Sequence, residues 1–63
     1  MPIAKIMIIE GRTPDTKRAL IKAVTAAIAE TLQAKPESIR VILEDVPSED
    51  WGIAGVSAKE LGR

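Results

Sequence analysis

The chain has 63 residues, with nine basic and nine acidic side chains, no histidine and no cysteine. This length allows one domain, spanning residues 1–63, and the absence of cysteine and histidine excludes disulfides and the usual structural zinc sites. The charge balance lacks the basic stripe of nucleic-acid binders, and no apolar run reaches the length of a membrane span. The start of the chain has no signal-peptide pattern. We therefore expect a cytoplasmic protein that binds neither nucleic acid nor a membrane.

Hydrophobic residues make up 46% of the chain, and Trp51 is the one aromatic residue. A domain of this size buries only about 60% of the surface that its unfolded chain exposes, so it is marginally stable alone. The sequence therefore carries more apolar material than one small domain can cover, and it predicts self-association.

Residues 2–9 are short, isoleucine-rich and bounded by Glu10 and Gly11, which predicts a strand. Alternate side chains point to opposite faces of a strand, and both faces are largely apolar here. We expect the chain's own helix to cover one face and a neighbouring subunit to cover the other.

A helix is predicted from about Pro14 to Gln33. Thr13 offers a capping hydroxyl, Pro14 suits the first helical position, and Asp15 places an acid in the first turn. Apolar residues then recur at three- and four-residue steps, at Leu20, Ile21, Val24, Ile28 and Leu32. Charged residues are expected on the solvent side, at Lys17, Arg18, Lys22 and Glu30. Lys35-Pro36 ends the helix, because the residue before proline leaves helical space.

The remaining elements complete the predicted architecture. Residues 36–38 suit a single turn, residues 39–46 a second strand, residues 47–50 a polar turn and residues 51–56 a small hairpin. Ser57 suits the cap of a last turn through Leu61. The predicted fold class is α/β (α+β): one βαβ unit with parallel strands and a C-terminal hairpin, assembling as a homo-oligomer.

Pro2 is the first candidate for chemistry. If Met1 is removed, Pro2 carries a free secondary amine, a base able to titrate near neutral pH in a chain without histidine or cysteine. Many proteins start with Met-Pro, however, and proline is tolerated at the first residue of a strand. Position alone therefore leaves both interpretations of Pro2 open.

Arg12 and Arg40 are candidates for gripping a carboxylate, because a guanidinium makes two parallel hydrogen bonds to it. Arg40 opens the second strand, so a parallel sheet places it near the same edge as Pro2. Arg12 lies a whole strand away, roughly 25–30 Å from its own Pro2, and reaches that amine only from another chain. Simpler alternatives are a solvated Arg12 paired with Glu10 or Asp15, and an outward-facing Arg40 paired with Glu44 on the same face of its strand.

Trp51 suits either a core plug or the wall of an active site. The acidic residues show no metal-ligand spacing, and the chain has no glycine loop for phosphate. We therefore predict no metal site.

Five segments together resemble the 4-oxalocrotonate tautomerase family. They are Pro2-Ile3, Ile-Glu-Gly-Arg at 9–12, the long helix, Ser-Ile-Arg-Val-Ile at 38–42 and Trp-Gly-Ile-x-Gly at 51–55. The resemblance covers essentially the whole chain, and the joint spacing makes it specific. It implies a homohexamer built as a trimer of βαβ dimers, a catalytic N-terminal proline and no cofactor. It also implies the tautomerisation of dienols or unsaturated 2-oxo acids such as 2-hydroxymuconate, with the catabolism of aromatic compounds as the best-known setting.

The resemblance also implies residue roles. Pro2 would be the general base, and Arg40 would hold one carboxylate and polarise the neighbouring oxygen. Arg12 from a neighbouring subunit would bind the distal carboxylate, and Trp51 would be the aromatic wall, usually phenylalanine in the family. An amine in an apolar pocket beside two guanidiniums should have a lowered pKa, because desolvation and like charge oppose its protonated form.

The sequence leaves three alternatives to a tautomerase. A hydrolytic dehalogenase fits less well, because Ile53 stands where related enzymes need a carboxylate to activate water. A non-catalytic oligomeric scaffold, or the inactive partner subunit of a hetero-oligomer, would keep the fold without turnover. Retention of Met1 would favour these two alternatives, since the Pro2 nitrogen would then be an amide without basicity.

Overall fold

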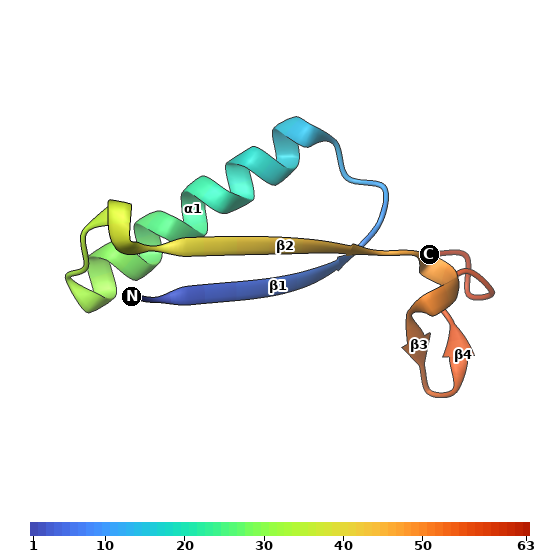
Figure 1. Cartoon of the computed structure of the whole chain (residues 1–63). Coiled ribbons are helices and arrows are strands. Elements are labelled where there is room, and N and C mark those ends of the chain that lie inside the picture. The colour runs from blue at the N-terminus through green and yellow to red at the C-terminus, as the bar shows by residue number, and fades with distance from the viewer.

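The computed structural model describes all of residues 1–63. In chain order the elements are β1 (Ile3–Ile9), α1 (Pro14–Leu32), the 3-10 helix η1 (Pro36–Ser38), β2 (Arg40–Val46), the 3-10 helix η2 (Ser48–Asp50), β3 (Gly52–Ile53) and β4 (Val56–Ser57). The predicted order of elements is confirmed. Figure 1 shows that β3 and β4 form a hairpin beyond the ends of the two long strands.

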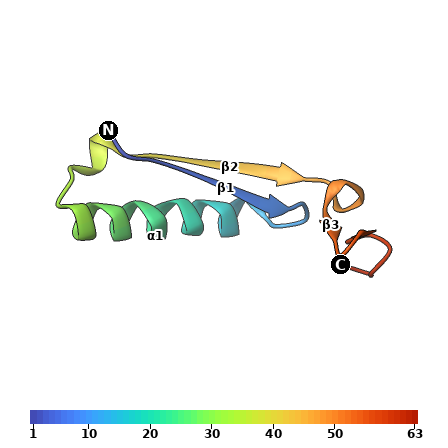
Figure 2. The ribbon, with the colours of Figure 1, turned by 90° about the horizontal axis from the view of Figure 1, so that it is seen from below.

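The two long strands form a parallel sheet. They pair without interruption, from Ile3 opposite Arg40 to Ile9 opposite Val46. Helix α1 lies along one face of this sheet, as Figure 2 shows in the second view. The predicted βαβ unit, with its parallel strands and C-terminal hairpin, is therefore confirmed.

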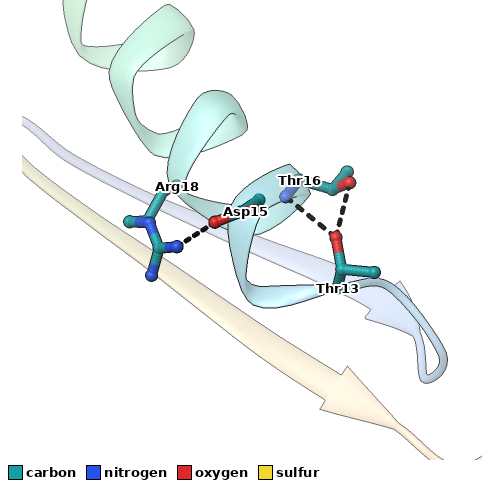
Figure 3. A network of polar contacts seen from close by, with 4 residues as sticks. All are labelled: Thr13, Asp15, Thr16 and Arg18. Atoms are coloured by element: carbon teal, nitrogen blue, oxygen red, sulfur yellow. Dashed lines mark hydrogen bonds and ion pairs between the residues drawn. The ribbon is translucent and has the colours of Figure 1, made fainter.

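Helix α1 begins as the sequence predicts. Thr13 has extended backbone angles, and its hydroxyl oxygen accepts a hydrogen bond from the amide of Thr16 at 3.2 Å. Pro14 occupies the first turn, and Asp15 pairs with Arg18 three residues later (Figure 3). The helix ends at Leu32 and not at Gln33, because Gln33 turns into the left-handed conformation at φ 53° and ψ 43°.

The starts of the two long strands and the position of one side chain also differ from the sequence expectations. The strands begin at Ile3 and Arg40, one residue later than predicted. Pro2 has no amide hydrogen to donate, and the amide of Ile39 donates to Pro36 in the η1 turn at 3.0 Å. Lys17 was expected on the solvent side of the helix. It instead reaches across to β2 and forms an ion pair with Asp45.

Much of the apolar surface is uncovered. Only Ile39 and Ala58 are buried, and Ile3, Met7 and Ile42 on the outer face of the sheet are 64%, 54% and 49% exposed. The radius of gyration is 14.4 Å, against about 11 Å for a compact chain of this length. The accessible area is 4729 Å², against about 4,000 Å² for a compact monomer of this mass. A single chain thus lacks a closed core, because its helix covers only one face of the sheet.

The hairpin and the segment after it are held by local hydrogen bonds. Ala54 and Gly55 have positive φ values of 52° and 84°, which a tight two-residue hairpin turn requires. The Ser57 hydroxyl oxygen accepts the amide of Glu60 at 3.2 Å, so the predicted capped turn is present. In the helices of this structure, no stretch is long and apolar enough to cross a membrane.

Candidate active site

Pro2 and Arg40 lie together at one end of the sheet. The amide of Arg40 donates to the carbonyl oxygen of Pro2 at 3.0 Å, immediately before the pair Ile3 and Arg40 in the register. This placement follows from parallel pairing, because the starts of parallel strands share one edge. The structure therefore brings the candidate amine and one candidate arginine to the same edge.

The guanidinium of Arg40 is anchored to the main chain. Its Nη1 donates to the carbonyl oxygens of Glu37 at 2.7 Å and Ile39 at 3.2 Å, both next to the η1 turn. The nearest acid along its strand, Glu44, instead forms a 3.8 Å ion pair with Lys5 of β1. Arg40 thus forms no ion pair, and the other N–H groups of its fork remain available for an anion.

Arg12 lies at the opposite end of the sheet, beside a surface hollow of about 460 Å³. This volume falls within the range of sites for small molecules. The hollow is lined by Met7, Ile8, Ile9, Glu10, Arg12, Trp51 and Arg63. Three apolar residues of β1 thus contribute to the lining, together with two arginines and one tryptophan.

Arg12 has no acidic partner within the chain. The carboxylate of Glu10 accepts the amide of Ser48 at 3.1 Å, and Asp15 pairs with Arg18. Arg12 is exposed in a loop, as the simpler alternative expects, but it pairs with neither Glu10 nor Asp15. Its guanidinium is an unpaired cation beside an apolar hollow, a suitable place for the carboxylate of a ligand.

Trp51 is half-buried and lines the same hollow as Arg12. It follows η2, which Glu10 holds against the end of β1 through the amide of Ser48. The carbonyl of Trp51 in turn accepts the amide of Ala58 at 2.7 Å, so the main chain around the indole is fixed on both sides. Trp51 thus forms a wall of the hollow and does not plug a core.

The four candidate residues fall into two pairs at opposite ends of the βαβ unit. Pro2 and Arg40 share the start of the sheet, whereas Arg12 and Trp51 share its far end. Each strand has seven residues, so the ends lie roughly 20 Å apart or more. One chain cannot bring both pairs to one small substrate. No group of His, Cys, Asp or Glu side chains is arranged to hold a metal ion.

Sequence reasoning missed two residues at the hollow. Glu10 was considered as the boundary of a strand and as a partner of Arg12, whereas in the structure it anchors the turn before Trp51. Arg63 was not singled out, although it lines the hollow with Arg12. No sequence spacing relates Arg63 to Arg12, because the position of Arg63 at the hollow depends on the turns after β2 and β4.

The fold and this arrangement define a small βαβ protein of the tautomerase class, and comparison with known proteins gives the family. The model of the family described as "Tautomerase enzyme" matches residues 2–61. A 2-hydroxymuconate tautomerase of Comamonas testosteroni is 54% identical over 63 residues, the full length of both chains. The chain therefore belongs to the tautomerase family, and it is an isomerase of the keto-enol tautomerase type.

Solved structures agree with this assignment. A structure from a study of the 4-oxalocrotonate tautomerase isozymes of Methylibium petroleiphilum has a TM-score of 0.96 and 56% identity, covering 98% of this chain and 100% of the other. A heterohexameric 4-oxalocrotonate tautomerase of Chloroflexus aurantiacus has a TM-score of 0.93 and 33% identity, covering 97% and 98% of the two chains. The comparisons give no support to a non-catalytic scaffold.

Proposed function

We propose that this protein converts the dienol form of an unsaturated 2-oxo dicarboxylate, such as 2-hydroxymuconate, to its conjugated 2-oxo form. The relative in Comamonas testosteroni is named for that substrate. The observation that carries the proposal is the separation of Pro2 and Arg40 from the unpaired Arg12 and Trp51 at opposite ends of the sheet. Residues 1–63 act as one βαβ domain, and each substrate lies between ends from different chains.

Pro2 is the proposed general base. After removal of Met1 its nitrogen is a secondary amine, which accepts the proton of the substrate hydroxyl as the carbonyl forms. The electron pair moves along the conjugated system, and the same nitrogen returns the proton to a carbon further along the chain. One O–H bond breaks and one C–H bond forms, so the product is an isomer of the substrate.

Arg40 and Arg12 are proposed to hold the two ends of the substrate. Arg40 would bind one carboxylate and the neighbouring oxygen, stabilising the negative charge of the dienolate with the N–H groups that its backbone contacts leave free. Arg12 of another copy would bind the distal carboxylate, and Trp51 would flank the carbon chain. The indole and the lining of β1 would exclude water and strengthen both ionic contacts.

The proposed assembly is a homohexamer, a trimer of dimers. The open outer face of the sheet, with Ile3, Met7 and Ile42 exposed, supports burial against further copies. A second copy is also required to complete the site, since Arg12 cannot reach its own Pro2. Light scattering at several protein concentrations tests the assembly, and a monomer at working concentration would contradict both the hexamer and the shared site.

The decisive experiment measures ultraviolet absorbance changes of 2-hydroxymuconate with protein whose Met1 is shown by mass spectrometry to be absent. We expect rapid ketonisation by this protein and none by a sample that retains Met1, because an amide nitrogen cannot accept the proton. The retained-Met1 sample is a matched control, since its other residues are unchanged. Equal activity of the two samples would show that Pro2 is not the base. A role in the catabolism of aromatic compounds would follow from activity on such dienols.

A further inference from the structure

Arg63 shares the hollow with Arg12, and the roles proposed above do not use it. It also lies beyond residues 2–61, the part of the chain that matches the family model. We infer that Arg63 is a second specificity-determining cation: it binds the distal carboxylate together with Arg12 and selects dicarboxylates over monocarboxylates. This inference rests on the proposed function for the place of Arg12 in the site.

The main chain holds Arg63 in place. Its amide donates to the carbonyl of Ala58 at 2.9 Å, and the amide of Ala58 donates to the carbonyl of Trp51 at 2.7 Å. Ala58, which links the main chains of Arg63 and Trp51 through these two hydrogen bonds, is fully buried. Gly62 has a φ of 77°, the left-handed conformation that ends a helical turn and directs the next residue back. The position of Arg63 is thus linked to that of the indole wall.

The charges in the hollow favour an anion. The residues that line it include two arginines and one acid, Glu10, so their side chains together carry one net positive charge. Every ion pair within the chain involves other residues, so neither Arg12 nor Arg63 is neutralised. A carboxylate bound in the hollow would accept hydrogen bonds from both guanidiniums and offset their charge. A ligand ending in a methyl group would leave both cations unpaired.

The test compares muconate with sorbate, two unreactive six-carbon dienoates that differ by a carboxylate in place of a methyl group. Calorimetry measures their binding to the assembled protein, to Arg63→Gln and to Arg63→Lys. We expect Arg63→Gln to weaken muconate binding by about tenfold, as for the loss of one partly exposed charged hydrogen bond. Sorbate binding should stay within twofold, and Arg63→Lys should retain about half of the discrimination because it keeps the charge without the fork.

Arg18→Gln is the matched control, since it removes an exposed arginine that pairs with Asp15 and does not line the hollow. It should leave the binding of both ligands unchanged. Chromatographic size and circular dichroism of each variant verify the assembly and the fold. Unchanged muconate binding in Arg63→Gln would overturn the inference, and so would an equal loss for both ligands, which would indicate a general structural effect.

The outcomes also separate this inference from the proposed function. Turnover of 2-hydroxymuconate with unchanged discrimination in Arg63→Gln would refute the role of Arg63 alone. Muconate binding that depends on Arg63, without turnover of any dienol, would support the anion site and refute the proposed reaction. A protein that binds neither muconate nor sorbate would refute both. In active protein, the KM for 2-hydroxymuconate should rise in Arg63→Gln with kcat nearly unchanged, because Arg63 lies away from the proton transfer.

Discussion

The amide nitrogen of Arg40 lies 3.0 Å from the carbonyl oxygen of Pro2. This hydrogen bond joins main-chain atoms, so it does not depend on either side chain. Substitutions at both positions can therefore remove functional groups while the register of the two strands is retained. The relationship makes Pro2 and Arg40 suitable positions for testing chemistry separately from folding.

Replacement of Pro2 by alanine should lower kcat/KM for 2-hydroxymuconate by about a hundredfold, within the usual range for the loss of a positioned general base. The N-terminal amine of alanine is primary and less fixed in direction, which explains a remaining activity. The ultraviolet assay measures the effect, on samples whose N-terminus is verified. Full activity in this variant would mean that the proton acceptor is another group.

A mixture of two impaired variants should regain activity. Pro2→Ala and Arg12→Ala, unfolded and refolded together, form assemblies in which some sites combine an intact Pro2 with an intact Arg12 of another chain. With random mixing we expect about a quarter of the wild-type activity, because each residue is intact in half of the chains. Each variant refolded alone is the control. Activity no greater than that of the separate variants would contradict the shared site.

The pH dependence of kcat/KM should report the pKa of the Pro2 amine. In the proposed assembly the amine lies beside two guanidiniums and apolar side chains, and these should lower its pKa because both disfavour the protonated amine. The unprotonated form is the base, so activity falls as the pH decreases through the lowered pKa and stays high at neutral pH. Arg12→Gln removes one like charge and should move this acidic limb to higher pH. A limb at the value of an ordinary proline amine would exclude the proposed environment.

Introduction of a charge on the outer face of the sheet should dissociate the assembly. Ile42 lies beside Lys5 in the register and is 49% exposed in the single chain. Ile42→Glu would place a second carboxylate beside Lys5, which already pairs with Glu44. It would therefore bury excess negative charge in the proposed subunit interface, with a penalty of several kcal/mol if the charge is fully buried. Light scattering should show smaller species and the assay lower activity. Lys22→Glu, a charge change on the exposed side of α1, should leave the size unchanged.

Loss of the helix cap should destabilise the protein without affecting the site. Thr13→Ala removes the hydroxyl that accepts the amide of Thr16, and it should lower the free energy of unfolding by about 1 kcal/mol per chain. Thr13→Ser keeps the cap and is the control. Urea unfolding at one fixed chain concentration makes the comparison valid, since association contributes to stability. A larger effect in Thr13→Ser than in Thr13→Ala would contradict the role of the hydroxyl.

The sequence alone was sufficient to predict the order of the elements. Thr13, Pro14 and Asp15 predicted the start of the helix, and the apolar strands on either side of it predicted a parallel βαβ unit. These signals are local, since capping, proline geometry and side-chain alternation act over a few residues. Parallel pairing of the two strands was then sufficient to predict that Arg40 lies beside Pro2. The roles of Pro2, Arg12, Arg40 and Trp51 remain predictions.

The tertiary structure alone decided which groups meet at the far end of the sheet. Lys17 was expected in solvent, but the closeness of α1 to β2 lets it reach Asp45. Arg63 joined Arg12 because the hairpin, the buried Ala58 and the left-handed Gly62 return the chain to the hollow. These contacts depend on the directions of successive turns, and small changes in backbone angles move the residues that follow by many ångströms. Periodicity and spacing contain no information on such directions, so only the folded chain shows them.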